Sequence, residues 1–404
     1  MSLATDHNLP SLDTLSPTFQ QDAPDLIAAL HAEGHWLATT PLGFAVLEAE
    51  TVRELAGEPR LRTFGHWLLE MQGITSGRLY ESVGEAILFK EGPDHTRLRG
   101  LVSRAFNSRA VERLRPTMRS HLAELVDRVH PDGRCEFMSA IADSYPVAVI
   151  CDLVGAPQSD RPRFSAWAAS IFKQFGLTVA EDLDEIETAI AEIDAYTLNL
   201  LEHRRARPGN DLLSELLVAE EEGDRLSYDE LVMLVGALLL GGTDTTRNQL
   251  GLAVMCFAQH PDQWEALGAD PGLAERAVEE VLRYVPTAQG MLRVVVEDFD
   301  YRDVVFPAGS LVNLFTWAAN LQPDKVAYPL VFDIHADRGK WRPHTFGAGP
   351  HFCLGAILAR AELAEALRVL SQRMPRLELD GEVAMKPSFG LQGPMRLPIR
   401  FTPR

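Results

Sequence analysis

The sequence predicts a mainly helical (α+β) fold with a small β-rich part. From about residue 95 to about residue 285, apolar residues recur at helical spacing, most clearly over 110–129 and 185–206. Short β-like segments come later, at 291–301, 310–317 and 397–403. No internal repeat, low-complexity tract or Pro/Ser-rich linker divides the chain, so we expect residues 1–404 to form a single large domain.

The composition indicates a soluble protein in a reducing compartment. The formal net charge of −19 argues against nucleic acid or an anionic membrane as the main partner. The N-terminus lacks the pattern of a signal peptide, and the longest apolar run, 231–240, is too short to anchor the chain in a membrane. The four cysteines, Cys135, Cys151, Cys256 and Cys353, form no CxxC pair, which favours a cytoplasmic location.

The clearest single element is a helix that begins after Ser227. Ser227 and Glu230 have the spacing of a capping box, and no proline follows before Pro261. We therefore expect one continuous helix of ~50 Å, at ~1.5 Å per residue. Gly241 and Gly242 lie inside it and each costs roughly 1 kcal/mol relative to alanine, so another feature must compensate.

Cys353 lies in the segment FGAGPHFCLG, residues 346–355. A lone cysteine is more often a small buried apolar residue than a reactive one. Here the glycines permit unusual backbone geometry, and the helical pattern after Gly355 puts the sulfur near a helix N-terminus, which favours a thiolate. A stabilised thiolate with no second cysteine or zinc ligand nearby points to a single axial bond to haem iron.

This segment resembles the haem-binding loop of the cytochrome P450 family, F-G-x-G-x-H-x-C-x-G, at every fixed position. The resemblance covers about residues 90–400 and is weaker over 1–90. It implies the triangular, mainly helical P450 fold, with an N-terminal β and substrate-entry part before residue 90 and a haem-binding helical body after it. It also implies non-covalent haem b, with Cys353 as the axial iron ligand and Phe346 in the haem-binding loop.

The segment GGTDTT, residues 241–246, resembles the oxygen-binding helix of the same family. Glycine at Gly241 lets a flat cofactor and a diatomic ligand approach the backbone. Asp244 and Thr245 offer an acid and a hydroxyl that can relay protons to bound O2. The structural alternative for Thr245 is a hydroxyl bonded to the carbonyl four residues back.

Charged residues at fixed spacings extend the resemblance. Glu280 and Arg283 share a helix face and resemble the family's E-x-x-R motif, a buried structural ion pair. Arg338 is expected to join it, although the segment from Phe332 to Arg338 is two residues longer than usual. Four further residues match positions at which the family binds the haem propionates: His95, Arg99, Arg293 and His351. His344 is an additional candidate for this role. Any one of these alone would read as a solvated charge.

The resemblance implies a monooxygenase that inserts one oxygen atom from O2 into a lipophilic small molecule, commonly by hydroxylation. Two alternatives are a peroxide-using relative and a non-catalytic haem protein that senses or carries a gas. Seven residues lie at positions where the family recognises substrate: Trp67, Leu68, Met71, Ile74, Leu238, Leu292 and Leu391. Each of them is explained equally well as a residue of the apolar core.

Electrons must come from a separate protein, because no flavin or iron–sulfur module is visible. We expect a ferredoxin, served by ferredoxin reductase and NAD(P)H. Residues 97–119 carry seven arginines and one acid, Glu112, a local formal charge of +6 that would attract an acidic partner. By contrast, residues 181–187 carry five acids and no base. The structural alternative is that these arginines solvate helix faces.

Overall fold

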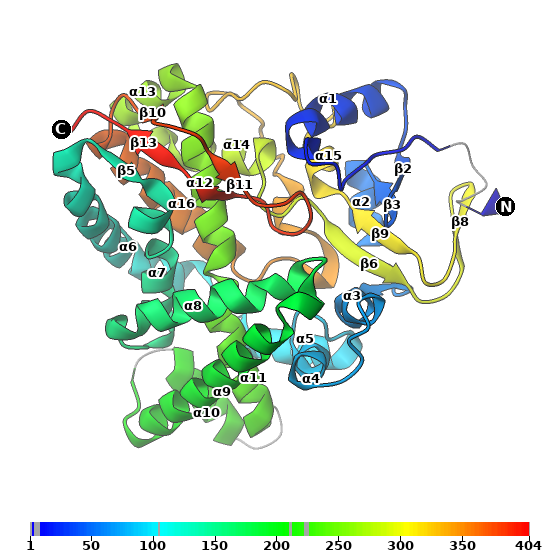
Figure 1. Cartoon of the computed structure of the whole chain (residues 1–404), viewed down its shortest axis with the longest axis horizontal. Helices are drawn as coiled ribbons and strands as arrows, with labels where there is room; N and C mark the ends of the chain where they lie inside the picture. The colour runs from blue at the N-terminus through cyan, green and yellow to red at the C-terminus, as the bar shows by residue number, and fades with distance from the viewer. Residues whose placement is uncertain (1, 4–8, 104–105, 210–211, 222–225, 404) are drawn as a thin grey trace.

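The computed structural model describes residues 2–3, 9–103, 106–209, 212–221 and 226–403. A helical body occupies one side of the molecule and a β-rich part the other (Figure 1). The N-terminus lies beside the β-rich part and the C-terminus at the far side of the helical body. The predicted mainly helical fold with a small β part is confirmed.

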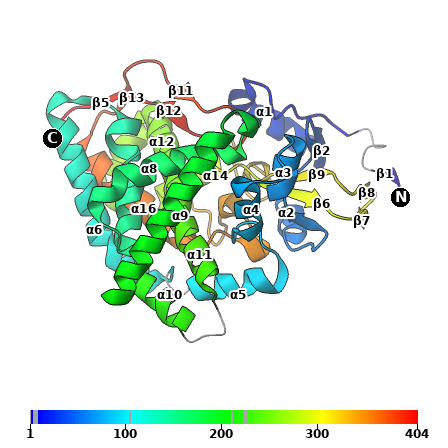
Figure 2. The same cartoon turned by 60° about the horizontal axis from the view of Figure 1, so that its bottom comes forward.

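The helical body consists of helices from the middle and the end of the chain. Their bounds are α5 (Gly92–Val102), α6 (Ser108–Val129), α7 (Tyr145–Val154), α8 (Arg161–Ile171), α9 (Leu183–Ala206), α10 (Leu212–Glu221), α11 (Tyr228–Gly241), α12 (Asp244–Gln259), α13 (Pro261–Ala269), α14 (Ala274–Tyr284) and α16 (Ala356–Arg373). α16 packs along α6, α13 and α14. In the turned view α9 comes to the front, with α8 and α11 against it (Figure 2). One large apolar core lies between these helices.

A five-stranded sheet forms the β-rich part. Its strands, in spatial order, are β2 (Leu37–Thr40), β3 (Gly43–Val46), β9 (Leu311–Leu314), β6 (Met291–Val295) and β4 (Leu61–Thr63). β3 and β9 are parallel, with Phe44 opposite Val312. Alternate residues of β3 face two apolar cores: Phe44 belongs to one and Ala45 to the other. α1 (Phe19–Ala32), α2 (Ala49–Leu55) and α15 (Thr316–Asn320) contribute to these cores.

The remaining strands are short. β1 (Ser2–Leu3), β8 (Val304–Phe306) and β7 (Phe299–Tyr301) form one sheet, and β10 (Glu378–Leu379), β13 (Pro398–Arg400) and β5 (Arg134–Glu136) form another. A hairpin of β11 (Ala384–Met385) and β12 (Pro394–Arg396) touches α12. The β-like segments predicted at 291–301, 310–317 and 397–403 contain β6, β7, β9 and β13, except that α15 begins at Thr316. Between β4 and α5 lie α3 (Gly65–Met71), which carries Trp67, Leu68 and Met71, and α4 (Arg78–Glu85).

The long helix predicted over 227–260 is wrong in one respect, because it is broken in the middle. The capping box at its start is present: Ser227 Oγ accepts from the Glu230 N–H at 3.2 Å, and Glu230 accepts from the Ser227 N–H at 2.9 Å. α11 ends at Gly241, and α12 begins at Asp244. A Cβ at Gly242 would lie 2.4 Å from Ile150 of α7, so this glycine allows α7 to approach closely at the break. Close packing on α7 therefore compensates for the weakness that the two glycines introduce.

Among the residues that the structure describes, no helix is both long and apolar enough to cross a membrane.

Candidate active site

The loop 346–355 holds Cys353 in a fixed position in front of α16. The Cys353 N–H donates to the Phe346 carbonyl at 2.9 Å, which closes the loop. Gly347 and Gly349 have φ of +75° and +67°, and a Cβ on Gly349 would lie 2.5 Å from the Ala56 carbonyl oxygen. Glycine is therefore required at this point. Arg360 of α16 lies over the Phe346 ring, 4.4 Å from its centroid.

The surroundings of the Cys353 sulfur act in two directions. Cys353 is exposed, yet the protein atoms around its sulfur desolvate the thiol and raise its pKa. The Gly355 N–H and the guanidinium groups of Arg99 and Arg360 lower that pKa. The predicted stabilisation of the thiolate by the start of α16 is thus present as the N–H of Gly355. Burial has the larger effect on the pKa of the thiol.

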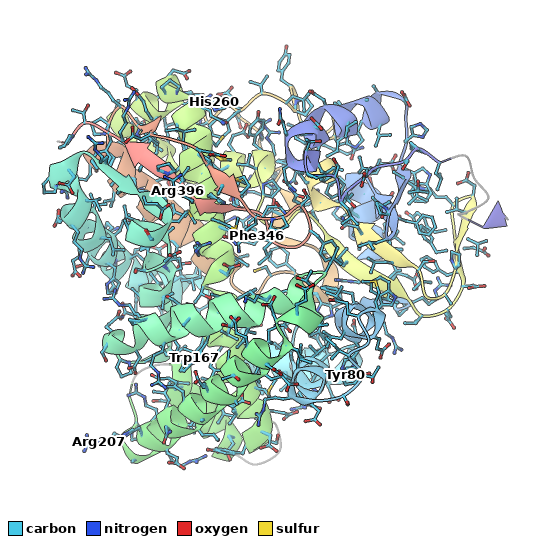
Figure 3. All side chains as sticks on the ribbon, viewed as in Figure 1. Tyr80, Trp167, Arg207, His260, Phe346 and Arg396 are labelled. Carbon is cyan, nitrogen blue, oxygen red and sulfur yellow. The ribbon has the colours of Figure 1, made fainter. Side chains whose placement is uncertain are left out.

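Two glycines of the predicted motifs, Gly241 and Gly355, have free space beside them. Phe346, at the start of the loop, is near the centre of the view, between the helical body and the strands (Figure 3). Gly241, at the end of α11, is exposed. A Cβ added to Gly241 or Gly355 would meet no atom of the described residues within 4 Å outside its own helix backbone. A flat group can therefore approach both glycines closely.

The structure brings together the four predicted cations. The His95 and His351 rings are 4.2 Å apart, and His351 contacts Glu91 at 3.2 Å. The Glu91 carboxylate also accepts from the Thr63 N–H, and Thr63 pairs with Arg293 across β4 and β6. Arg99 donates to the Phe352 carbonyl, next to Cys353. His344 lies apart from this group, in ring contact with Trp341.

These cations have too few anions. Among the described residues Glu91 is the one carboxylate in ion-pair contact with the group, and Arg293, which is 6% exposed, donates to the Leu292 carbonyl at 2.9 Å. Burial lowers the pKa of Arg293. Burial, with the positive charges of His351 and Arg99, lowers the pKa of His95 to about 4. Without a bound anion His95 is therefore neutral near pH 7, and it enters the group as a hydrogen-bond donor beside the guanidinium groups of Arg99 and Arg293. The donor set therefore fits a bound group that carries negative charge, as the two propionates of haem do.

Asp244 and Thr245 lie at the start of α12, directly after the break. The Thr245 hydroxyl donates to the Gly241 carbonyl at 3.1 Å, which is the bond that the structural alternative predicts. Asp244 is 8% exposed. Its carboxylate accepts from Lys386 Nζ at 2.9 and 3.1 Å and from Asn248 Nδ2 at 3.0 Å. In this structure the acid therefore binds Lys386 and Asn248.

The E-x-x-R pair is present and buried. Arg283, fully buried, donates to both Glu280 carboxylate oxygens at 2.7 and 2.9 Å. Arg338 donates to the same two oxygens, each at 2.9 Å, despite its longer connecting segment. The remaining donors of Arg283 bind the carbonyls of Pro329 and Val331. The carboxylate of Glu280 and the two guanidinium groups of Arg283 and Arg338 therefore bind one another, and this cluster needs no further charged partner.

The candidate substrate residues differ in exposure. Leu68, Ile74 and Leu238 are buried, and the last two belong to the large helical core. Met71 is 46% exposed. The half-buried members of the set are Trp67, Leu292 and Leu391.

Fewer arginines of the segment 97–119 are available to bind a partner protein than the local charge of +6 suggests. Arg115 and Arg119 both bind Glu365, which is 1% exposed. Arg97 binds Glu230, and Arg99 turns toward Phe352. Arg104 lies outside the described residues. Arg109 and Arg113 are exposed, and neither has an ion-pair partner among the residues that the structure describes. In the acidic stretch 181–187, Asp182 and Glu185 bind Lys173.

Two residues that sequence reasoning missed lie close to α12. One is Lys386, which carries no signal because its partner Asp244 is distant in the chain. The other is Glu362 of α16, which is 1% exposed and accepts from the Thr246 hydroxyl at 3.4 Å. Burial raises the pKa of Glu362 well above its usual value. In a sequence, a glutamate in such a helix reads as a surface residue.

Comparison with known proteins identifies the family. A family model described as "Cytochrome P450" matches residues 71–270 and 272–397. The chain is 36% identical to luteothin monooxygenase of Streptomyces thioluteus, over 98% of this chain and 96% of that one. It is also 36% identical to vitamin D(3) 25-hydroxylase of Pseudonocardia autotrophica, over 97% of both. Among solved structures, CalO2 matches with a TM-score of 0.90 at 30% identity, over 98% of this chain and 100% of that one.

The matches span nearly the whole chain, including the part before residue 90 where the sequence resemblance is weaker. A P450 works with a redox partner and binds lipophilic substrates. The protein belongs to the cytochrome P450 family and is a monooxygenase, an oxidoreductase that incorporates oxygen into its substrate.

Proposed function

We propose that residues 1–404 form one P450 domain that binds haem b non-covalently, with Cys353 as the axial thiolate ligand. The observation that carries this proposal is the anion-poor cation group beside the Cys353 loop. In it, His95, Arg99, Arg293 and His351 would hold the propionates. Phe346 would pack against the Cys353 side of the ring, and Gly241 would leave room on the other side. When bound, the haem supplies the activation of O2.

We infer that Asp244 and Thr245 move protons at this site. Their position at the break between α11 and α12 supports that role, since the Thr245 hydroxyl is held by a carbonyl beside the open face of Gly241. A hydroxyl that donates to a carbonyl keeps its lone pairs free to accept a further proton donor. The bond that the structural alternative predicts is therefore compatible with a relay.

We further propose that the substrate is a lipophilic small molecule and that the reaction is a hydroxylation. Named relatives at 36% identity include luteothin monooxygenase, vitamin D(3) 25-hydroxylase and 6-deoxyerythronolide B hydroxylase. The apolar residues Trp67, Leu292 and Leu391 are half-buried and so remain partly available for contact. Electrons would come from a ferredoxin with its reductase and NAD(P)H. The four free cysteines support a reducing, cytoplasmic location.

The test is the spectrum of the reduced protein with carbon monoxide. We expect the strongly red-shifted Soret band of thiolate ligation, and Cys353→Ser should lose it. Matched controls are Cys151→Ala and Cys256→Ala, since both thiols are buried in the helical core. A Cys353→Ser variant that kept the band would overturn the ligand assignment. Oxygen consumption that depends on NAD(P)H and the redox partners then separates a monooxygenase from a gas sensor, and activity with peroxide alone identifies a peroxide-using enzyme.

A further inference from the structure

Four phenylalanines from three separate segments meet in one place, which we call the phenylalanine cluster. They are Phe64, before α3, Phe89, after α4, and the two ends of the short helix η5 (Phe172–Phe175). The centroids of the Phe64 and Phe89 rings are 5.8 Å apart, with the ring planes at 89°. The Phe175 ring lies 6.4 Å from each of these two and 5.6 Å from Phe172. Phe175 is therefore the central ring of the cluster.

On one side, the phenylalanine cluster is joined to the cation group beside the Cys353 loop. The Thr63 hydroxyl donates to the Phe89 carbonyl at 3.0 Å, and the Thr63 N–H donates to the Glu91 carboxylate at 2.9 Å. Thr63 also pairs with Arg293 between β4 and β6, and Phe64 is the next residue in the chain. The cluster therefore lies next to the cations that we propose hold the haem propionates.

On the other side, the phenylalanine cluster lies beside the loop that carries Leu391. A Cβ at Gly390 would lie 3.4 Å from the Phe175 carbonyl oxygen. Gln72, at the end of α3, accepts from the Val179 N–H at 2.8 Å and so fixes the segment that follows Phe175. The rings are thus held between the cation group and a residue that is predicted to contact substrate.

The four side chains of the phenylalanine cluster are only half-buried, so part of their aromatic surface stays accessible in the folded protein. A phenylalanine pair that serves packing alone looks different. Phe299 and Phe306 have centroids 5.1 Å apart and are 3% and 0% exposed. Lys173, the cation within η5, binds Asp182 and Glu185. The accessible surface of the cluster is therefore apolar, and it suits an uncharged ligand.

We propose that the phenylalanine cluster is a wall of the substrate site and that the substrate presents a flat aromatic face to it. This inference rests on the proposed function, because it names the chemical class of the substrate. Aromatic rings attract one another edge-to-face or offset, at centroid distances of about 4.5–7 Å, beyond what the burial of apolar area contributes. The rings of the cluster already pack in this way, and an aromatic ligand extends the same packing. A cluster that only joined the segments 64–89 and 172–177 would not distinguish an aromatic ligand from a saturated one.

The experiment compares two neutral ligands that share a carbon skeleton and a hydroxyl group, 2-naphthalenemethanol and its saturated analogue decahydro-2-naphthalenemethanol. Titration calorimetry on the haem-loaded protein measures both dissociation constants, and the absorbance of the ferric haem is followed in parallel. The saturated compound is at least as apolar, so burial of apolar area alone gives it equal or tighter binding. The phenylalanine cluster should reverse this order and bind the aromatic compound about tenfold more tightly, as expected for one or two aromatic contacts.

Substitutions at Phe175 make the test specific to the cluster. Phe175→Leu removes the central ring but keeps an apolar side chain, so the preference for the aromatic compound should fall at least about threefold. Phe175→Tyr restores an aromatic face and should return the preference to within about twofold of the wild-type value. Phe299→Leu is the matched control, because it removes a ring from the buried pair in the β-rich part. It should lower the thermal midpoint and leave the preference unchanged.

Each outcome decides between the two interpretations. Equal or tighter binding of the saturated compound by the wild-type protein overturns the proposal, and so does the absence of binding by the aromatic compound up to its solubility limit. An unchanged preference in Phe175→Leu assigns the cluster to packing alone. Thermal midpoints are recorded first, and Phe172→Leu, at the edge of the cluster, takes the place of a Phe175→Leu variant that does not fold. Loss of the thiolate band in the wild-type protein would contradict the proposed function instead, and the calorimetric preference would still decide the role of the cluster.

Discussion

Glu280, Arg283 and Arg338 form one buried cluster of charges, and the cations around His351 form another. In the first, one carboxylate binds two guanidinium groups, and backbone carbonyls accept from the remaining Arg283 donors. In the second, Arg293 is buried like Glu280, with 6% of its surface exposed against 3%, but it has no carboxylate within ion-pair distance among the described residues. Buried charges persist in proteins when they are paired. The closed cluster is thus part of the fold, and the open one is the cation group that we propose binds haem.

The largest effect is expected from breaking the closed cluster. Glu280→Ala leaves two guanidinium groups buried without their anion, so the free energy of unfolding should fall by about 3–5 kcal/mol. Urea denaturation of the purified protein measures this. Glu279→Ala is the matched control on the same helix, because Glu279 binds the half-buried Arg360. It should cost less than about 1 kcal/mol. Equal losses in the two variants would contradict the distinction between the clusters.

Glu362 extends the comparison to a buried acid whose hydrogen-bond partner is a hydroxyl. Its pKa is raised well above 4.5 by burial, so the folded protein keeps a proton that the unfolded chain loses. Its contribution to stability is complete below about pH 4.5 and decreases as pH rises toward the raised pKa, by at most about 1.4 kcal/mol per pH unit. Glu362→Gln should therefore flatten the fall in unfolding free energy as the pH rises above about 4.5.

Glu91 should show the opposite pH dependence and serves as the control for Glu362. Burial raises its pKa, but the hydrogen bonds from His351 and from the Thr63 N–H prevail and hold that pKa at about 2. Its contribution to stability is therefore complete above about pH 4.5 and decreases as the pH falls toward about 2. Parallel urea titrations of Glu362→Gln and Glu91→Gln would refute both assignments if the two variants shifted the pH profile in the same direction.

Removing a cation from the second cluster should weaken the binding of haem and have little effect on the stability of the fold. Arg293→Met removes a buried cation whose bonded partner is a backbone carbonyl, so the unfolding free energy of the apoprotein should change by less than about 1 kcal/mol. The affinity for haem should fall about tenfold, as expected for one lost bond to a charged group. Haem titration of the apoprotein, followed by absorbance, measures this. A loss of stability as large as that in Glu280→Ala would mean that Arg293 is structural.

The smallest effect concerns charges that neither cluster uses. Arg109 and Arg113 are exposed on α6, so Arg109→Glu with Arg113→Glu should leave stability within about 0.5 kcal/mol. If an acidic ferredoxin docks there, its reduction of the P450 should slow severalfold at low salt and depend less on salt. Stopped-flow reduction measures this, with Arg396→Glu as the control. An unchanged rate and salt response would place the docking surface elsewhere.

Local signals explain which parts of the fold the sequence predicts well. The helices α6 and α9 and the capping box at Ser227 are encoded by residues within a few positions of one another. The break after Gly241 is not encoded by neighbouring residues, because it depends on Ile150 of α7, far earlier in the chain. The strands β2 and β3 are only four residues each, and β3 acquires its second partner, β9, from a much later part of the sequence.

The same division applies to the site. The loop around Cys353 and the spacings of Glu280 and His95 can be recognised because each is a short motif. Lys386 and Glu362 cannot be recognised in the sequence, because a lysine after a short strand and a glutamate in an alanine-rich helix are ordinary surface patterns. Their functional interest comes only from what packs against them. The charge of residues 97–119 misleads for the converse reason, because Glu230 and Glu365 reach that segment from distant helices.

The parallel pairing of β3 with β9 has a consequence for synthesis on the ribosome. Val312 emerges roughly 270 residues after Phe44, which is a delay of roughly 15–50 s at about 5–20 residues per second. Throughout that time the edge of β3 that will bind β9 has no partner from its own sheet. β13, which closes on β5, is formed by residues 398–400 and is made later still. Nascent chains of this enzyme therefore carry an open strand edge until β9 has emerged, and during that time they are candidates for chaperone binding.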